Sequence, residues 1–225
     1  MKKVITSLAA GLLVSVALFG QVKSSDNTFT FSRVPINGTK AQVIKSLETD
    51  GFQYLEFYDY LTGMFNGEKV KLRISTNHGI VDRILVEYPY CSAENDTRIK
   101  YNMLLSRFAR SEKYVCVNPR EEVPVKEELN RRITENSKYY DAVYFYLKKG
   151  INADQWVDDF KEEYRNFYNK PLAGLSYEEM EEALFCLPTR ISGAVSGVVW
   201  FTMINSHEIN INYINFKNRP RGEDL

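Results

Sequence analysis

Two pairs of alternating runs constrain the fold of this chain more than any other feature. Residues 69–74 alternate basic with aliphatic side chains, and residues 209–213 alternate isoleucine or tyrosine with asparagine. A period of two is typical of a strand with one face in water. A short turn separates each run from a second apolar run, at 77–79 in the first pair and at 205–207 in the second. The sequence therefore predicts two antiparallel hairpins.

Helix signals flank both hairpins. Thr39 and Gln42 form a capping box, which predicts a helix over 39–51. A second helix is predicted over about 93–111, with Ser92 as its cap. Its apolar residues at helical spacing are Ile99, Met103 and Phe108. Two more helices are predicted after caps in the later part of the chain, at Asn152 and Ser176.

Tyrosines gather on one face of two predicted strands, Tyr54 to Phe65 and Tyr139 to Leu147. The tyrosine faces consist of Tyr54, Tyr58, Tyr60, Tyr140, Tyr144 and Tyr146. The opposite faces consist of Leu55, Phe57, Leu61, Phe65, Val143, Phe145 and Leu147. We expect these aliphatic and aromatic faces to pack on helices, and the tyrosine faces to point outward or between the two parts of the chain.

The predicted fold class is α+β, with two similar halves that are each an antiparallel sheet backed by helices. The halves span 28–117 and 137–225, and each contains a tyrosine-faced strand, helices and a hairpin with histidine at its turn. This arrangement is typical of a weak tandem repeat. Residues 118–136 are charged and contain two prolines, so we interpret them as a linker or excursion. Limited proteolysis should cut there first.

Residues 1–21 have the layout of a secretory signal peptide: two lysines, an apolar run and then a polar segment. The run from Val4 to Phe19 is shorter than the roughly 20 residues that a membrane-spanning helix needs, although a retained anchor is the alternative. No cysteine follows the run that could accept a lipid. We therefore expect an exported protein, periplasmic or extracellular, with no lipid anchor and no membrane insertion after removal of the signal.

The charge balance argues against nucleic acid as a partner. The chain has 29 basic and 29 acidic residues, and loss of Lys2 and Lys3 with the signal leaves a slight acidic excess. A protein that binds duplex nucleic acid needs a basic face to displace counterions from phosphates. Tyrosine and phenylalanine are abundant, at 15 and 13 residues, whereas only two histidines are present.

The sequence contains no motif that fixes a reaction, and we expect neither cofactor nor metal. His78 and His207 both fall in predicted turns, and the acidic residues at 178–182 suit the start of a helix. Nucleophile-elbow, phosphate-loop and dinucleotide-binding patterns are absent from the sequence. The three cysteines are expected to be free, with Cys186 a core thiol.

Two stretches near the ends of the chain carry a resemblance to known sequences. The opening stretch runs from Phe31 through Val34-Pro35-Ile36-Asn37-Gly38-Thr39 to Gly51-Phe52. The closing stretch runs from Gly197 to Thr202 and on to Asn218–Leu225. Both stretches resemble a family of secreted proteins that is abundant in gut Bacteroidetes and has no assigned activity. In outline, the expected arrangement of helices against hairpins is similar to the tandem fold of beta-lactamase inhibitory protein, which implies no inhibitory function.

These observations favour a non-catalytic binding or protein-interaction module of the bacterial envelope. Tyrosine supplies large, rigid contact area at low entropic cost, so the six tyrosines named above are the candidate partner-binding residues. The partner would be an unknown protein or glycan. Alternatives are a glycan-binding module that uses the same tyrosines as stacking platforms, and a hydrolase with an unrecognised carboxylate pair. A structural role for the tyrosines, covering the second face of a sheet, also stays open.

Overall fold

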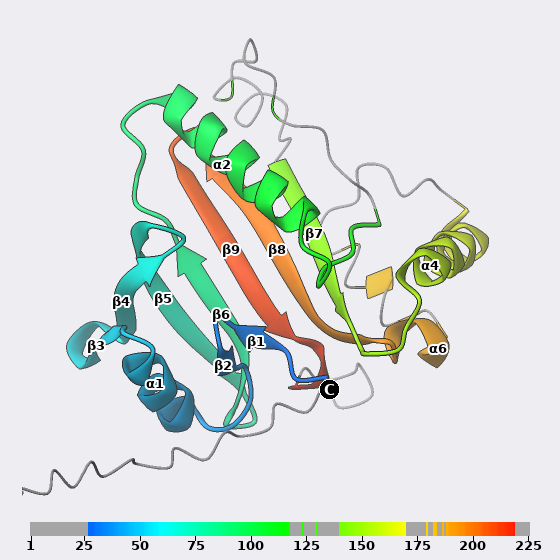
Figure 1. Cartoon of the computed structure of the whole chain (residues 1–225), viewed down its shortest axis with the longest axis horizontal. Helices are drawn as coiled ribbons and strands as arrows, with labels where there is room; N and C mark the ends of the chain where they lie inside the picture. Colours follow the sequence, from blue (N-terminus) through cyan, green and yellow to red (C-terminus); the bar gives the residue numbers. More distant parts are fainter. Residues whose placement is uncertain are drawn as a thin grey trace, which may run out of the picture.

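The computed structural model describes residues 27–117, 140–169 and 188–218, together with positions 123, 129, 179, 182, 183 and 186. It is an α+β fold, as predicted, built on one seven-stranded antiparallel sheet (Figure 1). The strand order is β3-β4-β5-β6-β9-β8-β7. The strands are β3 (Gln53–Leu55), β4 (Tyr60–Phe65), β5 (Glu68–Asn77), β6 (Ile80–Glu87), β7 (Tyr140–Leu147), β8 (Val195–Asn205) and β9 (Glu208–Asn215).

Tight turns set the hairpin register. His78 and Gly79 join β5 to β6, and both have positive φ angles, +48° and +78°. The pair Asn66-Gly67 joins β4 to β5 in the same way, with φ angles of +52° and +88°. Two central residues with positive φ give a turn whose twist matches that of the strands, which favours Asn and Gly. Both predicted hairpins, β5–β6 and β8–β9, are confirmed.

Strands β6 and β9 join the two halves of the sequence. Arg83 pairs with Ile214, and Glu87 pairs with Asn210 in the same antiparallel ladder. The sequence predicts one sheet for each half, whereas these pairs merge the strands of both halves into a single sheet. The physical reason is that a strand with an open edge is stabilised by any partner of matching register, however distant in sequence.

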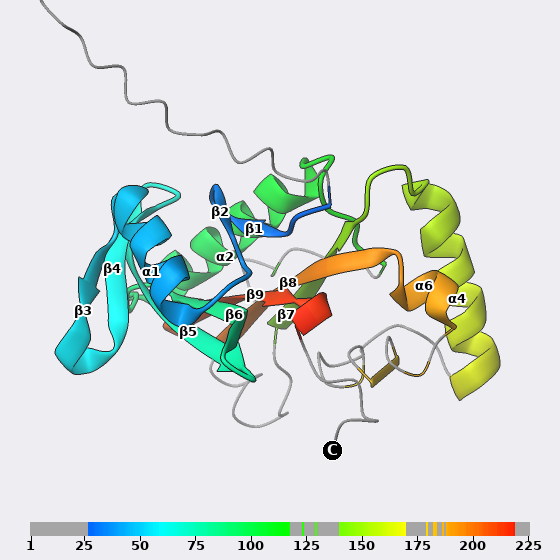
Figure 2. The ribbon, with the colours of Figure 1, turned by 90° about the horizontal axis from the view of Figure 1, so that it is seen from below.

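One face of the sheet carries the larger core. Helices α1 (Lys40–Thr49) and α2 (Glu94–Ala109) lie across it, with the short strands β1 (Thr30–Phe31) and β2 (Val34–Pro35) between them (Figures 1 and 2). Leu72, Ile84 and Phe201 are buried beneath these elements. Thr39 accepts a hydrogen bond from the Gln42 amide, and the Gln42 side chain accepts one from the Thr39 amide. The predicted capping box is therefore confirmed.

Among the described residues, the elements that cover the opposite face lie toward β7. There α4 (Ala153–Tyr168) and α6 (Thr189–Ser192) lie at the β7 end of the sheet, and Phe216 in the 3₁₀ turn η2 (Phe216–Asn218) joins the same core (Figure 2). Phe160 packs against Phe145 of β7, with ring centroids 5.9 Å apart. Asn152 caps α4 as expected, since its side chain accepts a hydrogen bond from Gln155. Strand β7 thus buries both of its faces.

Two local expectations are wrong. The segment 54–65 is not one strand, because the 3₁₀ turn η1 (Glu56–Tyr58) separates β3 from β4. Helix α2 begins after Ala93 with no side-chain cap, so Ser92 is not its cap. Its buried face holds Tyr101, Leu104, Leu105 and Phe108, whereas Ile99 and Met103, which share the helical spacing of Phe108, are exposed.

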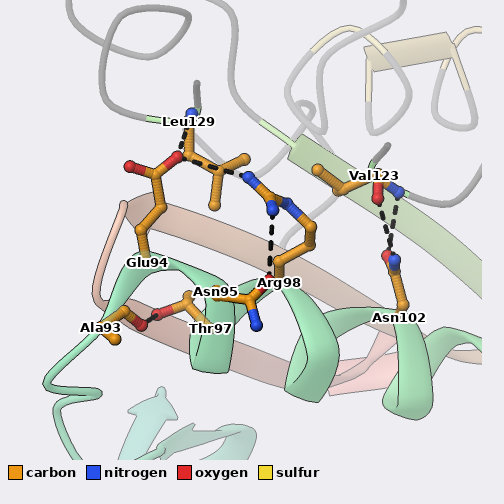
Figure 3. Close-up of polar contacts among 8 residues, drawn as sticks. All are labelled: Ala93, Glu94, Asn95, Thr97, Arg98, Asn102, Val123 and Leu129. Carbon is orange, nitrogen blue, oxygen red and sulfur yellow. Dashed lines mark hydrogen bonds and ion pairs between the residues drawn. The ribbon is translucent and has the colours of Figure 1, made fainter. Parts of the chain in front are cut away.

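Helix α2 also holds two positions of the segment that follows it (Figure 3). The Asn102 amide donates to the Val123 carbonyl at 3.0 Å and accepts from the Val123 amide at 2.9 Å. Glu94 accepts a hydrogen bond from the Leu129 amide and pairs with Arg98 at 3.5 Å. Val123 and Leu129 are both buried. Their side chains therefore belong to the core that α2 covers.

The predicted signal peptide (1–21) lies outside the described residues, as does the predicted linker (118–136) apart from Val123 and Leu129. Within the described part of the chain, no helix is both long and apolar enough to cross a membrane.

Candidate binding surface

A row of polar side chains crosses the face of the sheet that α1 and α2 leave open. Successive strand pairings place one polar residue of each strand opposite the next. Beginning at β3, the row consists of Gln53, Thr62, Lys71, Glu87, Asn210 and Thr202. None of the six is buried, whereas the neighbouring row on the other face is apolar and belongs to the core.

Part of this row forms the floor of a groove of about 660 Å³. Thr62, Lys71 and Asn210 contribute from β4, β5 and β9. Tyr90 and Ile204 are also in its lining, at the ends of the strands. Such a volume accommodates a small organic ligand or a few monomers of a polymer.

The carboxylates in the groove already have partners. Glu87 accepts from Arg73 at 2.7 Å, and Glu68 accepts from Lys100 at 2.7 Å. Glu208 accepts a hydrogen bond from Asn205 at 2.8 Å. Two lysines of the lining, Lys69 and Lys71, form no ion pair with any described residue. Among the described residues, the groove therefore offers two unpaired lysines, while Glu68 and Glu87 are neutralised by cations and Glu208 has only a neutral hydrogen-bond partner.

Tyr90 presents a fixed aromatic ring at the groove. It is 65% exposed and stacks on His207, with centroids 4.8 Å apart and planes 19° from parallel. His207 Nδ1 lies 2.8 Å from the Cys91 carbonyl oxygen, and because a carbonyl only accepts, this nitrogen carries a proton. The Cys91 amide donates in return to the His207 carbonyl at 2.9 Å. These bonds hold the His207 ring, on which the Tyr90 ring stacks.

A second exposed feature, which we call the aromatic tip, consists of Phe57, Tyr58 and Tyr60 around η1. Phe57 is 91% exposed and Tyr58 60%. The Phe57 and Tyr58 rings meet edge to face at 4.9 Å, and Tyr58 stacks on Tyr60 at 5.8 Å. Lys71 lies 5.4 Å above the Tyr60 ring, in cation–π geometry. The tip is therefore continuous with the cationic side of the groove.

Asp59 holds the tip in its conformation. It follows η1 with φ of +52°, a left-handed geometry that only a minority of non-glycine residues adopt. Its carboxylate accepts from Lys40 of α1 at 2.7 Å and from the Tyr54 hydroxyl at 2.8 Å. These two bonds lower the pKa of Asp59 below its ordinary value. The hydrogen bond between Tyr54 and Asp59 also raises the pKa of the Tyr54 hydroxyl. The tip is thus anchored to both β3 and α1.

The six tyrosines singled out by sequence do not form one patch. Tyr54, Tyr58 and Tyr60 lie at the β3–β4 edge of the sheet, and the β7 tyrosines belong to the opposite edge strand. Tyr144 is 6% exposed and contacts Phe108 and Phe201, so of the two expected positions, outward or between the two parts of the chain, it occupies the second. Burial raises the pKa of its hydroxyl.

The other two tyrosines of β7, Tyr140 and Tyr146, lie on the same face of the strand as Tyr144. Tyr146 packs against the same core as Tyr144, and the side chain of Tyr140 lies outside the described residues. The physical reason is that α2 covers this face of β7, so Tyr144 and Tyr146 pack against the core.

Sequence reasoning missed the two most exposed aromatic residues of these features. Phe57 was expected to be on the helix-packed face, because a continuous strand would place it there. Tyr90 follows Pro89 beyond the end of β6, where no periodicity identifies a facing side. The strongest available signal for the first error was Asp59, since aspartate tolerates the left-handed conformation that ends η1.

The histidines and cysteines are the last candidates, by sequence, for catalytic or metal-binding residues. Among the described residues, no cluster of histidine, cysteine and carboxylate side chains could hold a metal ion. His78 and His207 are in separate turns, as predicted. All three cysteines are free, and Cys186 is exposed, so the expectation of a core thiol is wrong.

Comparisons with protein-family models, with curated proteins and with solved structures find no match for this chain. The resemblance at the two ends of the sequence therefore stays a prediction.

Proposed function

We propose that this protein is an exported, non-catalytic interaction module of the bacterial envelope that binds a protein partner through the aromatic tip. The observation that carries the proposal is the exposure of Phe57. Its side chain is 91% exposed, on a turn that the contacts of Asp59 hold in place. Exposing a large apolar side chain costs free energy, so a rigid exposed cluster of rings favours a binding role.

The geometry of the tip suits a binding hot spot. Phenylalanine and tyrosine have few rotatable bonds, and the Asp59 contacts to Lys40 and Tyr54 order the turn before a partner arrives. Preorganisation lowers the entropic cost of association. Lys71 and Arg73 next to Tyr60 add a polar rim around the aromatic centre.

Site-specific photocrosslinking tests the proposal. A benzoylphenylalanine placed at Phe57 should crosslink a discrete protein in the native envelope fraction. The same residue at Phe167, which is 61% exposed on α4, is the matched control and should crosslink little. Equal labelling from both positions, or none from Phe57, would contradict the proposal.

Truncation then measures the energetics. The double variant Phe57→Ala/Tyr58→Ala should weaken binding of that partner by about thirtyfold or more, since a hot spot contributes roughly 2 kcal/mol or more. Its melting temperature should stay within a few degrees of wild type, because both side chains are exposed. Phe167→Ala should leave binding unchanged.

Export is tested separately, by fractionation of cells that express the chain with and without residues 1–21.

A further inference from the structure

We infer that the groove on the open sheet face is a second binding site, specific for a carbohydrate that carries carboxylate groups along its length. It borders the aromatic tip, with Lys71 between them, and does not depend on a protein partner. Four observations on the described residues carry the inference: two unpaired lysines, two glutamates neutralised by cations, free hydrogen-bonding groups and an exposed aromatic ring stacked on His207.

The lysines supply the preference for an acidic ligand. Lys69 and Lys71 are exposed on the same face of β5, and neither is paired with a described carboxylate. Two residues apart on a strand, their Cα atoms are about 6.6 Å apart. Two separated cations fit anions that repeat along a polymer better than they fit a single charged group. Because Glu68 and Glu87 each have a cationic partner, they repel such a ligand little.

Tyr90 supplies the preference for a sugar ring. Its ring is 65% exposed and lines the groove, while His207 backs it at 4.8 Å. The C–H face of a pyranose packs on such a ring, and a ring already held by a stack loses little entropy on binding. A flexible acidic peptide has no equivalent flat apolar face.

Thr62 and Asn210 supply hydrogen bonds for hydroxyl groups. Both lie in the polar row at the groove floor and are half-buried. Neither side chain bonds to another described residue, so each is available to a ligand. A hydroxyl both donates and accepts, which matches the hydroxyl of Thr62 and the amide of Asn210.

Calorimetric titration of the mature chain with defined oligosaccharides tests the site. We expect an oligogalacturonate to bind at least about tenfold more tightly than a neutral oligosaccharide of equal length, since hydrogen bonds to charged groups contribute the difference. Binding should weaken as salt is added. Lys69→Gln/Lys71→Gln should weaken binding by about tenfold or more, whereas Lys45→Gln/Lys113→Gln, two exposed lysines elsewhere, should not.

Variants at Tyr90 separate a sugar from a peptide. Tyr90→Ala should weaken oligogalacturonate binding by about tenfold, and Tyr90→Trp should restore it, because tryptophan keeps the stacking surface. Poly-glutamate of the same charge should bind weakly and respond little to Tyr90→Ala. Equal binding of poly-glutamate, no binding of any acidic oligosaccharide, or binding that survives the lysine substitutions would each overturn the inference. Phe57→Ala/Tyr58→Ala should leave sugar binding intact, so failure here is distinguishable from failure of the proposed function.

Discussion

Gly197 shows how one residue without a side chain makes room for the core. It lies in β8, and its Cα approaches the ring of Phe29 so closely that an added Cβ would overlap the ring atoms. Phe29 in turn contacts Tyr146 and Tyr213, at 5.6 and 6.2 Å between centroids. The segment that contains Phe29 therefore packs directly on β8, where Gly197 leaves room for its ring.

Substituting Gly197→Ala should lower the free energy of unfolding by about 1–3 kcal/mol, the usual cost of overpacking a core. Urea denaturation followed by circular dichroism measures it. In the double variant Gly197→Ala/Phe29→Ala, the added methyl group has space. The loss of unfolding free energy in the double variant should therefore be smaller than the sum of the losses in the two single variants. Full additivity would show that the clash with Phe29 is not the cause.

Asp59 makes the aromatic tip sensitive to acid. Hydrogen bonds from Lys40 and Tyr54 lower its pKa in the folded protein, so the carboxylate stabilises the tip above its unfolded pKa of about 3.9. This contribution is lost as the pH falls through the lower folded value. We expect the ring resonances of Tyr58 to shift below about pH 4 in NMR spectra, and Asp59→Asn to abolish that titration. A titration that persists in Asp59→Asn would identify another group as the cause.

At the scale of elements, the position of α2 depends on polar contacts to the segment that follows it. The Asn102 amide both donates to and accepts from the Val123 backbone. Asn102→Asp keeps the acceptor but replaces the donor with an oxygen that repels the Val123 carbonyl. We expect faster protease cleavage near Val123 in this variant, measured by mass spectrometry of the fragments. Ile99→Asn, on the exposed side of α2, is the control and should leave the cleavage rate unchanged.

Elements encoded by neighbouring residues could be predicted from the sequence. The capping box of α1, the cap of α4 and the two hairpins each depend on residues a few positions apart. The break at η1 was missed because period-two alternation continues across it. The face that α2 buries was missed because Thr97 and Arg98, both buried, interrupt its apolar stripe. The groove could not be predicted, because the pairing that places Asn210 beside Glu87 joins distant strands.

At the scale of the whole molecule, the two halves share one core. Phe108 of α2 packs on Phe201 of β8, with ring centroids 4.7 Å apart, and Val86 of β6 pairs with Ile211 of β9. Separating the halves would expose these residues and leave the edge of β6 unpaired. The sheet is therefore one structural unit although its strands come from both halves.

Residues 22–225 should accordingly unfold in a single transition, and residues 28–117 expressed alone should show no cooperative transition. Urea titrations followed by circular dichroism and by tyrosine fluorescence measure both. Coincident curves from the two probes are expected for residues 22–225. A sigmoidal transition for the isolated fragment would show instead that each half is an independent domain.

The β6–β9 ladder also sets the pace of folding. Arg83 meets Ile214 only after a loop longer than half the chain has closed, so the centre of the sheet forms late and folding is slow. Until then, the apolar strand β6 has an open edge that can pair with another chain. Slow closure is compatible with the proposed export, since a chain must cross a membrane before its sheet forms. The same delay leaves the edge of β6 open to pairing with other chains until β9 arrives.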